Sequence, residues 1–164
     1  FNTSTDKKVV KESVAPPAVY TAGYERLSVD AFLNRLIQNG IQRIIDVRNN
    51  PVARRYGFHK STLAQLGGRI GVQYVHVPEL GIQPALRQNL ISPDDYDALF
   101  DRYVAETLVD EPLAINRVVD LMAKKPSVLV CMEADPRFCH RSRLAETVSQ
   151  ATGLPIQDLG CSTT

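Results

Sequence analysis

The stretch VLVCMEADPRFCHRSRLAE, from Val128 to Glu146, holds the pattern from which the fold can be read. Its first four residues are apolar, as in a short buried strand, and its last residues have the spacing of a helix. Between them lie acidic residues, a proline and the turn Cys139-His140-Arg141. The stretch therefore indicates a strand, a loop and a helix in succession, with polar and sulfur-bearing side chains where the strand ends.

The same order of strand and helix repeats along the chain. Short apolar runs predict strands at 18–23, 42–47, 72–77, 127–131 and 155–159. Cap and stop residues predict helices from Ser28 to Gly40, from Ser61 to Gly67-Gly68, from Ser92-Pro93, from Pro112, and from Ser142 to Gly153. Strands that alternate with helices predict an α/β, Rossmann-like three-layer domain, with a mainly parallel sheet of about five strands and helices on both faces.

Length and composition are those of one globular domain. The chain has 164 residues, of which 44% are hydrophobic and 23% charged. We expect a flexible tail or linker over residues 1–16, a single domain over 17–160 and a short tail over 161–164. No apolar run approaches the roughly 20 residues that span a bilayer, so we expect no membrane partner. Because the chain begins with Phe1, its true N-terminus is left open.

The formal net charge is only +1, but the charges are unevenly distributed. The segment from Arg43 to Arg69 contains six basic residues and one acidic residue, and the segment from Asp94 to Glu111 contains seven acidic residues and one basic residue. This distribution fits either two solvated faces or two functional surfaces of opposite sign. The three cysteines, an odd number, do not indicate a disulfide framework and favour a reducing cytoplasm.

Polar residues of interest follow the predicted strands. In open parallel sheets, ligands bind in the crevice beyond the carboxyl ends of the strands. The residues at those ends are Tyr24-Glu25, Asp46 and Arg48, His76 and Glu79, and then Cys131, Glu133 and the Cys139-His140-Arg141 turn. We therefore expect one site at this edge of the sheet.

Motifs at these strand ends resemble those of a known family. The motifs are YTAGYE (20–25), DVRNNP (46–51), GFHKSTL (57–63), YVHVPELG (74–81) and CMEADPRFCHR (131–141). In order and spacing the chain from Val19 to about Leu159 is similar to the bacterial and archaeal domain of unknown function 488. By this resemblance the family-defining residues are Gly23, Tyr24, Asp46, Arg48, Pro51, Phe58, Tyr74, Gly81, Cys131, Glu133, Cys139, His140 and Arg141. Ala53 departs from the serine that is common there. The resemblance implies the fold and the place of the site, but no reaction.

The sulfur-bearing residues admit two chemistries that we do not favour. Structural zinc takes four ligands, usually in close pairs. Cys131, Cys139 and His140 offer three, and adjacent side chains at a helix start are expected to point apart, so we expect no zinc. Cys131 and Arg137 have the spacing of a phosphate-binding thiolate loop, but the acids and the proline between them argue against it. The same acids and proline argue against rhodanese-like sulfur transfer. If Cys131 is neither a ligand nor a nucleophile, it is a small apolar residue packed in the strand.

An anion site at the start of the last helix fits these residues better. Helix N-termini bind anions, and an arginine can bind a phosphate group through two hydrogen bonds. The predicted ligand-binding residues are Tyr24, Arg48, Arg54, Arg55, Lys60, Cys139 and Arg141. We expect His140 to act as the acid or base, with Asp46 and Glu133 orienting these groups or binding Mg²⁺ or Mn²⁺. Tyr24, Tyr56 and Phe58 suit base stacking, or else cover the sheet edge.

Two functions remain open at this point. The first is a cytoplasmic domain that binds a phosphate-bearing small molecule, a nucleotide or nucleic acid; if it is an enzyme, we expect a phosphoester, nucleotide or nucleic-acid hydrolase. The second is a non-catalytic protein-interaction module, whose sheet edge is locked by ion pairs and whose acidic helix from Asp94 docks a partner. Arginines paired tightly within the protein, for example Arg141 with Glu133 or Asp46, would favour the second function. The oligomeric state is left open.

Overall fold

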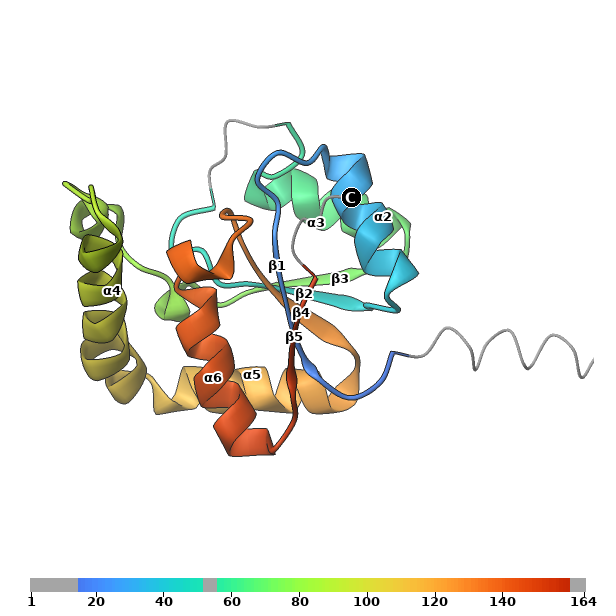
Figure 1. The fold of residues 1–164 in the computed structure, drawn as a ribbon. Coiled ribbons are helices and arrows are strands. Elements are labelled where there is room, and N and C mark those ends of the chain that lie inside the picture. The colour runs from blue at the N-terminus through green and yellow to red at the C-terminus, as the bar shows by residue number, and fades with distance from the viewer. Residues whose placement is uncertain (1–14, 52–55, 160–164) are drawn as a thin grey trace, which may run out of the picture.

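A computed structural model describes residues 15–51 and 56–159 as an all-parallel, five-stranded sheet between two layers of helices (Figure 1). The strands stand side by side in the order β3-β2-β4-β1-β5. Their bounds are β1 Val19–Gly23, β2 Arg43–Asp46, β3 Gln73–His76, β4 Ser127–Cys131 and β5 Ile156–Asp158. The predicted α/β, Rossmann-like arrangement is confirmed.

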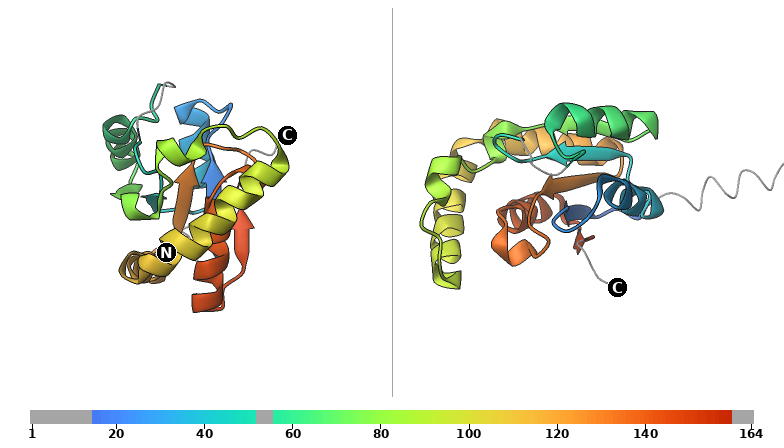
Figure 2. Two further views of the ribbon diagram at one scale, coloured as in Figure 1. Left: turned by 90° about the vertical axis from the view of Figure 1, so that its left-hand side faces the viewer. Right: turned by 90° about the horizontal axis from the view of Figure 1, so that it is seen from above.

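Helices from different parts of the chain cover the two faces of the sheet (Figure 2). One face carries α2 (Val29–Gln38) and α3 (Lys60–Arg69). The other face carries α5 (Pro112–Lys124), α6 (Arg141–Thr152) and α4 (Pro93–Arg102), which the π-helical segment η3 (Tyr103–Leu108) continues. Within the part of the chain that the structure describes, no helix has the length and apolar character needed to cross a bilayer.

The apolar runs of the inner strands β1 and β4 follow from this double cover. Residues of β4 alternate between the two cores, with Val128 and Val130 facing α2 and α3, and Leu129 facing α5 and α6. Tyr20 and Val19 of β1 alternate in the same way. A strand with both faces buried is apolar throughout instead of alternating with polar residues.

Most helix ends lie where their sequence signals place them. Ser28 accepts a hydrogen bond from the backbone of the first turn of α2, and Ser92 forms a capping box with Asp95 at the start of α4. Gly153, with φ of 76°, ends α6.

The predicted end of α3 at Gly67-Gly68 is wrong, because the helix continues to Arg69. A Cβ on Gly67 would lie 3.0 Å from the carbonyl oxygen of Val72, so this glycine permits close packing instead of ending the helix. The left-handed residue that follows the helix is Gly71, with φ of 81°. Ser61, predicted as the cap of this helix, lies inside it, because α3 begins at Lys60 and its N-cap is His59.

The strand order brings distant segments to one edge of the sheet. β4 lies between β1 and β2, with Gly23 beside Cys131 and Asp46 beside Val130. The segments that follow β1, β2 and β4 therefore emerge together. The loops after these strands build the site.

Candidate functional site

A pocket of about 180 Å³ opens at the carboxyl ends of the strands. Its walls come from the ends of β1 and β4, from the segment after β2, and from the short 3-10 helix η2 (Pro84–Arg87). The lining residues are Tyr24, Arg48, Asn49, Asn50, Ile82, Pro84, Arg87, Cys131, Met132, Glu133 and His140. This is the crevice in which open parallel sheets bind their ligands.

A buried ion pair closes the pocket behind the end of β2. Asp46 is fully buried and accepts from Arg48 Nε at 2.8 Å and from Arg48 Nη2 at 2.6 Å. It also accepts from the Tyr74 hydroxyl. The remaining Arg48 nitrogen, Nη1, donates to Phe58 O at 2.7 Å and to the Tyr24 hydroxyl at 3.1 Å. Every side-chain nitrogen of Arg48 is therefore engaged by the protein.

This pairing shifts the proton affinities of the groups around it. Burial acts to lower the pKa of Arg48, but its hydrogen bonds to Asp46 and the charge of that carboxylate outweigh burial and raise it. Burial first, and then the charge of Asp46, raises the pKa of Tyr74. Arg48 thus stays a cation and Tyr74 a neutral hydrogen-bond donor.

The aromatic residues near the site pack against one another. Tyr24 stacks on Phe58 with ring centroids 4.1 Å apart, and both rings meet Phe32 edge to face. The Arg48 guanidinium lies 5.3 Å from the centroid of the Tyr24 ring. Tyr24 and Phe58 are therefore buried rings that pack at the sheet edge, whereas Tyr56 is exposed.

His140 is held in one tautomer at the wall of the pocket. Its Nε2 lies 2.9 Å from the carbonyl oxygen of Val47, which can only accept a hydrogen bond, so Nε2 carries the proton. Nδ1 is left as an acceptor for Arg87 Nη2 at 3.3 Å. Burial lowers the pKa of His140 to about 4. At neutral pH the ring is therefore a neutral acceptor and has no proton to give from Nδ1.

Arg141, at the start of α6, joins the loop after β4 to the rest of the sheet. It is fully buried and donates to the carbonyl oxygens of Glu133 and Ala134, the latter at 3.0 Å, and to Asp158 Oδ1 at 3.2 Å. Gly23 makes room for this arrangement, because a Cβ there would lie 1.7 Å from Glu133 O. The partner that the sequence analysis offered, the carboxylate of Glu133 or Asp46, is wrong; Asp158 takes that place.

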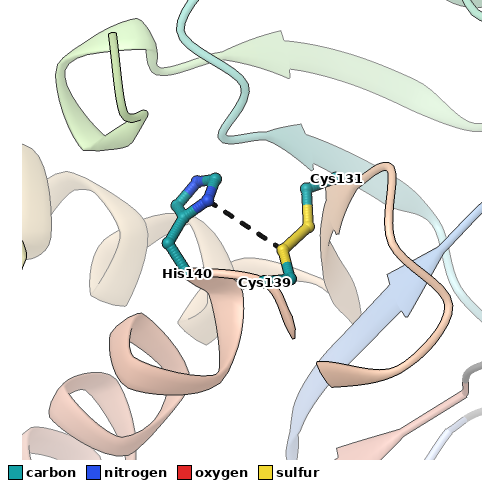
Figure 3. A group of neighbouring side chains, drawn as sticks. All are labelled: Cys131, Cys139 and His140. Atoms are coloured by element: carbon teal, nitrogen blue, oxygen red, sulfur yellow. Dashed lines mark hydrogen bonds between the residues drawn. A yellow bond between two sulfur atoms is a disulfide. The ribbon is translucent and has the colours of Figure 1, made fainter. Parts of the chain in front are cut away.

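A disulfide joins Cys131, at the end of β4, to Cys139, just before α6 (Figure 3). The cysteine count does not predict this bond. Cys139 Sγ also lies 3.9 Å from His140 Nδ1, and the ligand atoms of Cys131, Cys139 and His140 lie within 4.8 Å of one another. The expectation that the adjacent side chains of Cys139 and His140 point apart is therefore wrong.

The predicted site residues separate into three groups. Four line the pocket: Tyr24, Arg48, Glu133 and His140. Three are buried and absent from the lining: Asp46, Cys139 and Arg141. Lys60 is exposed on α3 and outside the lining, and Arg54 and Arg55 lie outside the described residues.

The structure adds Arg87, which the sequence analysis missed. Its side chain is 29% exposed, and it pairs with Glu133 Oε2 at 3.3 Å. The available signal was weak: a proline turn at Pro84, closely following the end of the third strand, with one cation. Asn49 and Asn50 of the DVRNNP motif also line the pocket, and their amides were not singled out.

The carboxylates expected to bind a divalent cation are mostly engaged elsewhere. Asp46 is held by Arg48, and Glu133 Oε2 pairs with Arg87 at 3.3 Å. Within residues 15–51 and 56–159, the group of three or more potential ligands found close together is Cys131, Cys139 and His140. The prediction of Mg²⁺ or Mn²⁺ gains no support from this geometry.

Comparison with known proteins gives the family of the chain. No curated protein and no solved structure matches it. A family model, described as domain of unknown function DUF488, matches residues 28–148. That range includes β2, β3 and β4 and the Cys139-His140-Arg141 turn. The chain belongs to the DUF488 family.

Proposed function

We propose that the pocket binds a small phosphate-bearing ligand, such as a mononucleotide, through Arg87. The observation that carries the proposal is the partial exposure of this guanidinium at the pocket, where it has one ion-pair partner at 3.3 Å. Ion pairs that reach solvent are weak, so Arg87 can turn from Glu133 to a phosphate at little cost. The buried Arg48 and Arg141 are engaged by protein groups and would shape the site without touching the ligand.

Neighbouring groups support a small ligand better than a long polyanion. The amides of Asn49 and Asn50 and the neutral ring of His140 add hydrogen-bonding groups to the wall. Among the described lining residues, Arg87 is the cation that is not already neutralised by a buried carboxylate. The nucleic-acid version depends on Arg54 and Arg55, which lie outside the described residues.

The geometry favours binding over hydrolysis. A general acid needs a proton to give near neutral pH, and burial lowers the pKa of His140 to about 4. Asp46, saturated by Arg48 and Tyr74, is not placed to activate water. Hydrolase activity therefore stays a prediction. So does the cytoplasmic location, because the Cys131–Cys139 disulfide removes the support that the cysteine count gave it.

The test compares two arginine variants in isothermal titration with adenosine, guanosine, cytidine and uridine monophosphates and with inorganic phosphate. Losing one charge-assisted contact, worth about 1.5–3 kcal/mol, should weaken binding by Arg87→Gln roughly 10- to 100-fold. Arg117→Gln, on the exposed side of α5, removes the same charge at a residue outside the pocket lining and should bind like the wild type. No binding by the wild type, or equal binding by Arg87→Gln, would refute the proposal.

One observation favours the second function, a non-catalytic interaction module. The internal pairing of Arg48 and Arg141 locks the sheet edge, as that hypothesis requires. Asp97 and Asp101 of α4 are 65% and 74% exposed, although both pair with Arg143. A partner that binds this acidic face should be lost with Asp97→Asn/Asp101→Asn and kept with Arg87→Gln.

A further inference from the structure

We infer that Cys131 and Cys139 form a redox-active pair, which exchanges its disulfide with low-molecular-weight thiols that enter the pocket. The inference does not depend on the proposed anion ligand, because it uses a different wall of the pocket. It rests on three features: the bond between the two sulfurs, the hydrogen-bond donors around them, and the unequal access to them.

Both sulfurs receive hydrogen bonds that stabilise negative charge. Arg141 Nη1 lies 3.4 Å from Cys131 Sγ, and the backbone N–H of Arg141 lies 3.4 Å from Cys139 Sγ. That backbone N–H belongs to the first residue of α6, where the helix dipole also favours an anion. Such surroundings stabilise thiolates, and a disulfide whose reduced form is stabilised is easily reduced. A purely structural disulfide requires no such donors.

Access to the two sulfurs is unequal. Cys131 lines the pocket, whereas Cys139 is fully buried and absent from the lining. A thiolate that enters the pocket therefore meets Cys131 Sγ first. The cavity of about 180 Å³ admits a small thiol, but the 2% exposure of Cys131 excludes direct attack by a thiol on a folded protein surface.

The reduction of the disulfide takes two thiol–disulfide exchange steps. An incoming thiolate attacks Cys131 Sγ, and the bond to Cys139 breaks, so that Cys139 leaves as a thiolate beside the N–H of Arg141. A second thiolate then attacks the outer sulfur of the mixed disulfide and releases Cys131 as a thiolate beside Arg141 Nη1. Two small thiols are oxidised to one disulfide by two electrons, and the cysteine pair is reduced. When Cys131 is a thiol, it can donate a hydrogen bond to Glu133 Oε1, which lies 3.9 Å from Cys131 Sγ.

The experiment uses the full chain with Cys161→Ser, which removes the third cysteine. The protein is equilibrated in buffers of 2-mercaptoethanol and 2-hydroxyethyl disulfide, a neutral couple that does not need an anion site. Free thiols are trapped with iodoacetamide and counted by mass spectrometry. We expect one reversible two-electron transition between the disulfide and the dithiol in the native protein. A pair that is reduced only after denaturation would overturn the inference.

Single-cysteine variants test the unequal access without altering the buried Arg141. In the same background, Cys139→Ser should form a mixed disulfide with 2-hydroxyethyl disulfide at Cys131 at least roughly tenfold faster than Cys131→Ser forms one at Cys139. Circular dichroism confirms that both variants are folded. Equal rates would overturn the assignment of Cys131 as the attacked sulfur. A reduced wild type that binds one zinc per chain and then resists oxidation would identify a metal site with His140 instead.

Discussion

The substitution Asp46→Asn tests whether the buried ion pair holds the edge of the sheet. It keeps the shape of the side chain but removes the charge that Arg48 meets at 2.6 Å and 2.8 Å. Arg48 is 8% exposed and Asp46 fully buried, so water cannot replace the lost partner. Breaking a buried pair by removing one member costs about 3–5 kcal/mol, which lowers the melting temperature of a domain of this size by roughly 6–20 °C.

Urea denaturation followed by circular dichroism measures this loss. Glu106→Gln is the matched control, since it removes one carboxylate from the exposed pair with Arg102 and should leave the midpoint nearly unchanged. Adding Arg48→Met to Asp46→Asn removes the uncompensated charge and should recover part of the stability. If Asp46→Asn is no more destabilising than the control, or if the second change makes no recovery, the pair is not what stabilises this edge.

Two further predictions concern close packing and pH. Gly23→Ala would place a Cβ 1.7 Å from Glu133 O and should lower the urea midpoint sharply. In the matched control Gly68→Ala, the added Cβ has no atom of the described residues within 4 Å, so this change should stabilise α3 by about 0.5–1 kcal/mol. Similar effects of the two changes would contradict the packing argument. Burial lowers the pKa of His140 from 6.5 to about 4, so between these values the unfolded state binds more protons. Stability should be full above about pH 6.5 and fall towards pH 4 by up to about 1.4 kcal/mol per pH unit, and this slope should be lost in His140→Gln.

The parts of the fold that could be predicted are those with a local cause. The strand over 127–131 is apolar because both its faces are covered, and Ser92 marks the start of α4 through its own hydrogen bond. The place of β4 between β1 and β2 has no such signal, because it depends on how distant strands pair. In the site, too, the part with a local cause could be predicted. Arg48, Glu133 and His140 follow the ends of predicted strands, and all three line the pocket.

The rest of the site could not be predicted because it depends on contacts between distant segments. Arg87 reaches the pocket from a 3-10 turn that carries no motif, and it meets residues 46 and 53 positions further along the chain. The disulfide depends on the path of the loop between Cys131 and Cys139. A chain with three cysteines gives no guide to that path.

The central position of β4 has a consequence for the order in which the protein forms during synthesis. Tyr20 of β1 and Ile44 of β2 both lie beside Val128 of β4. β1 and β2 are synthesised early, and each lacks this neighbouring strand until β4 has been synthesised. Until residues 127–131 leave the ribosome, β1 has no completed neighbour, since β5 is made later still. Contacts between positions so far apart are slow to form, and unpaired strand edges invite association with other chains. Nascent chains of this protein should therefore depend on chaperones that shield apolar segments until β4 is inserted.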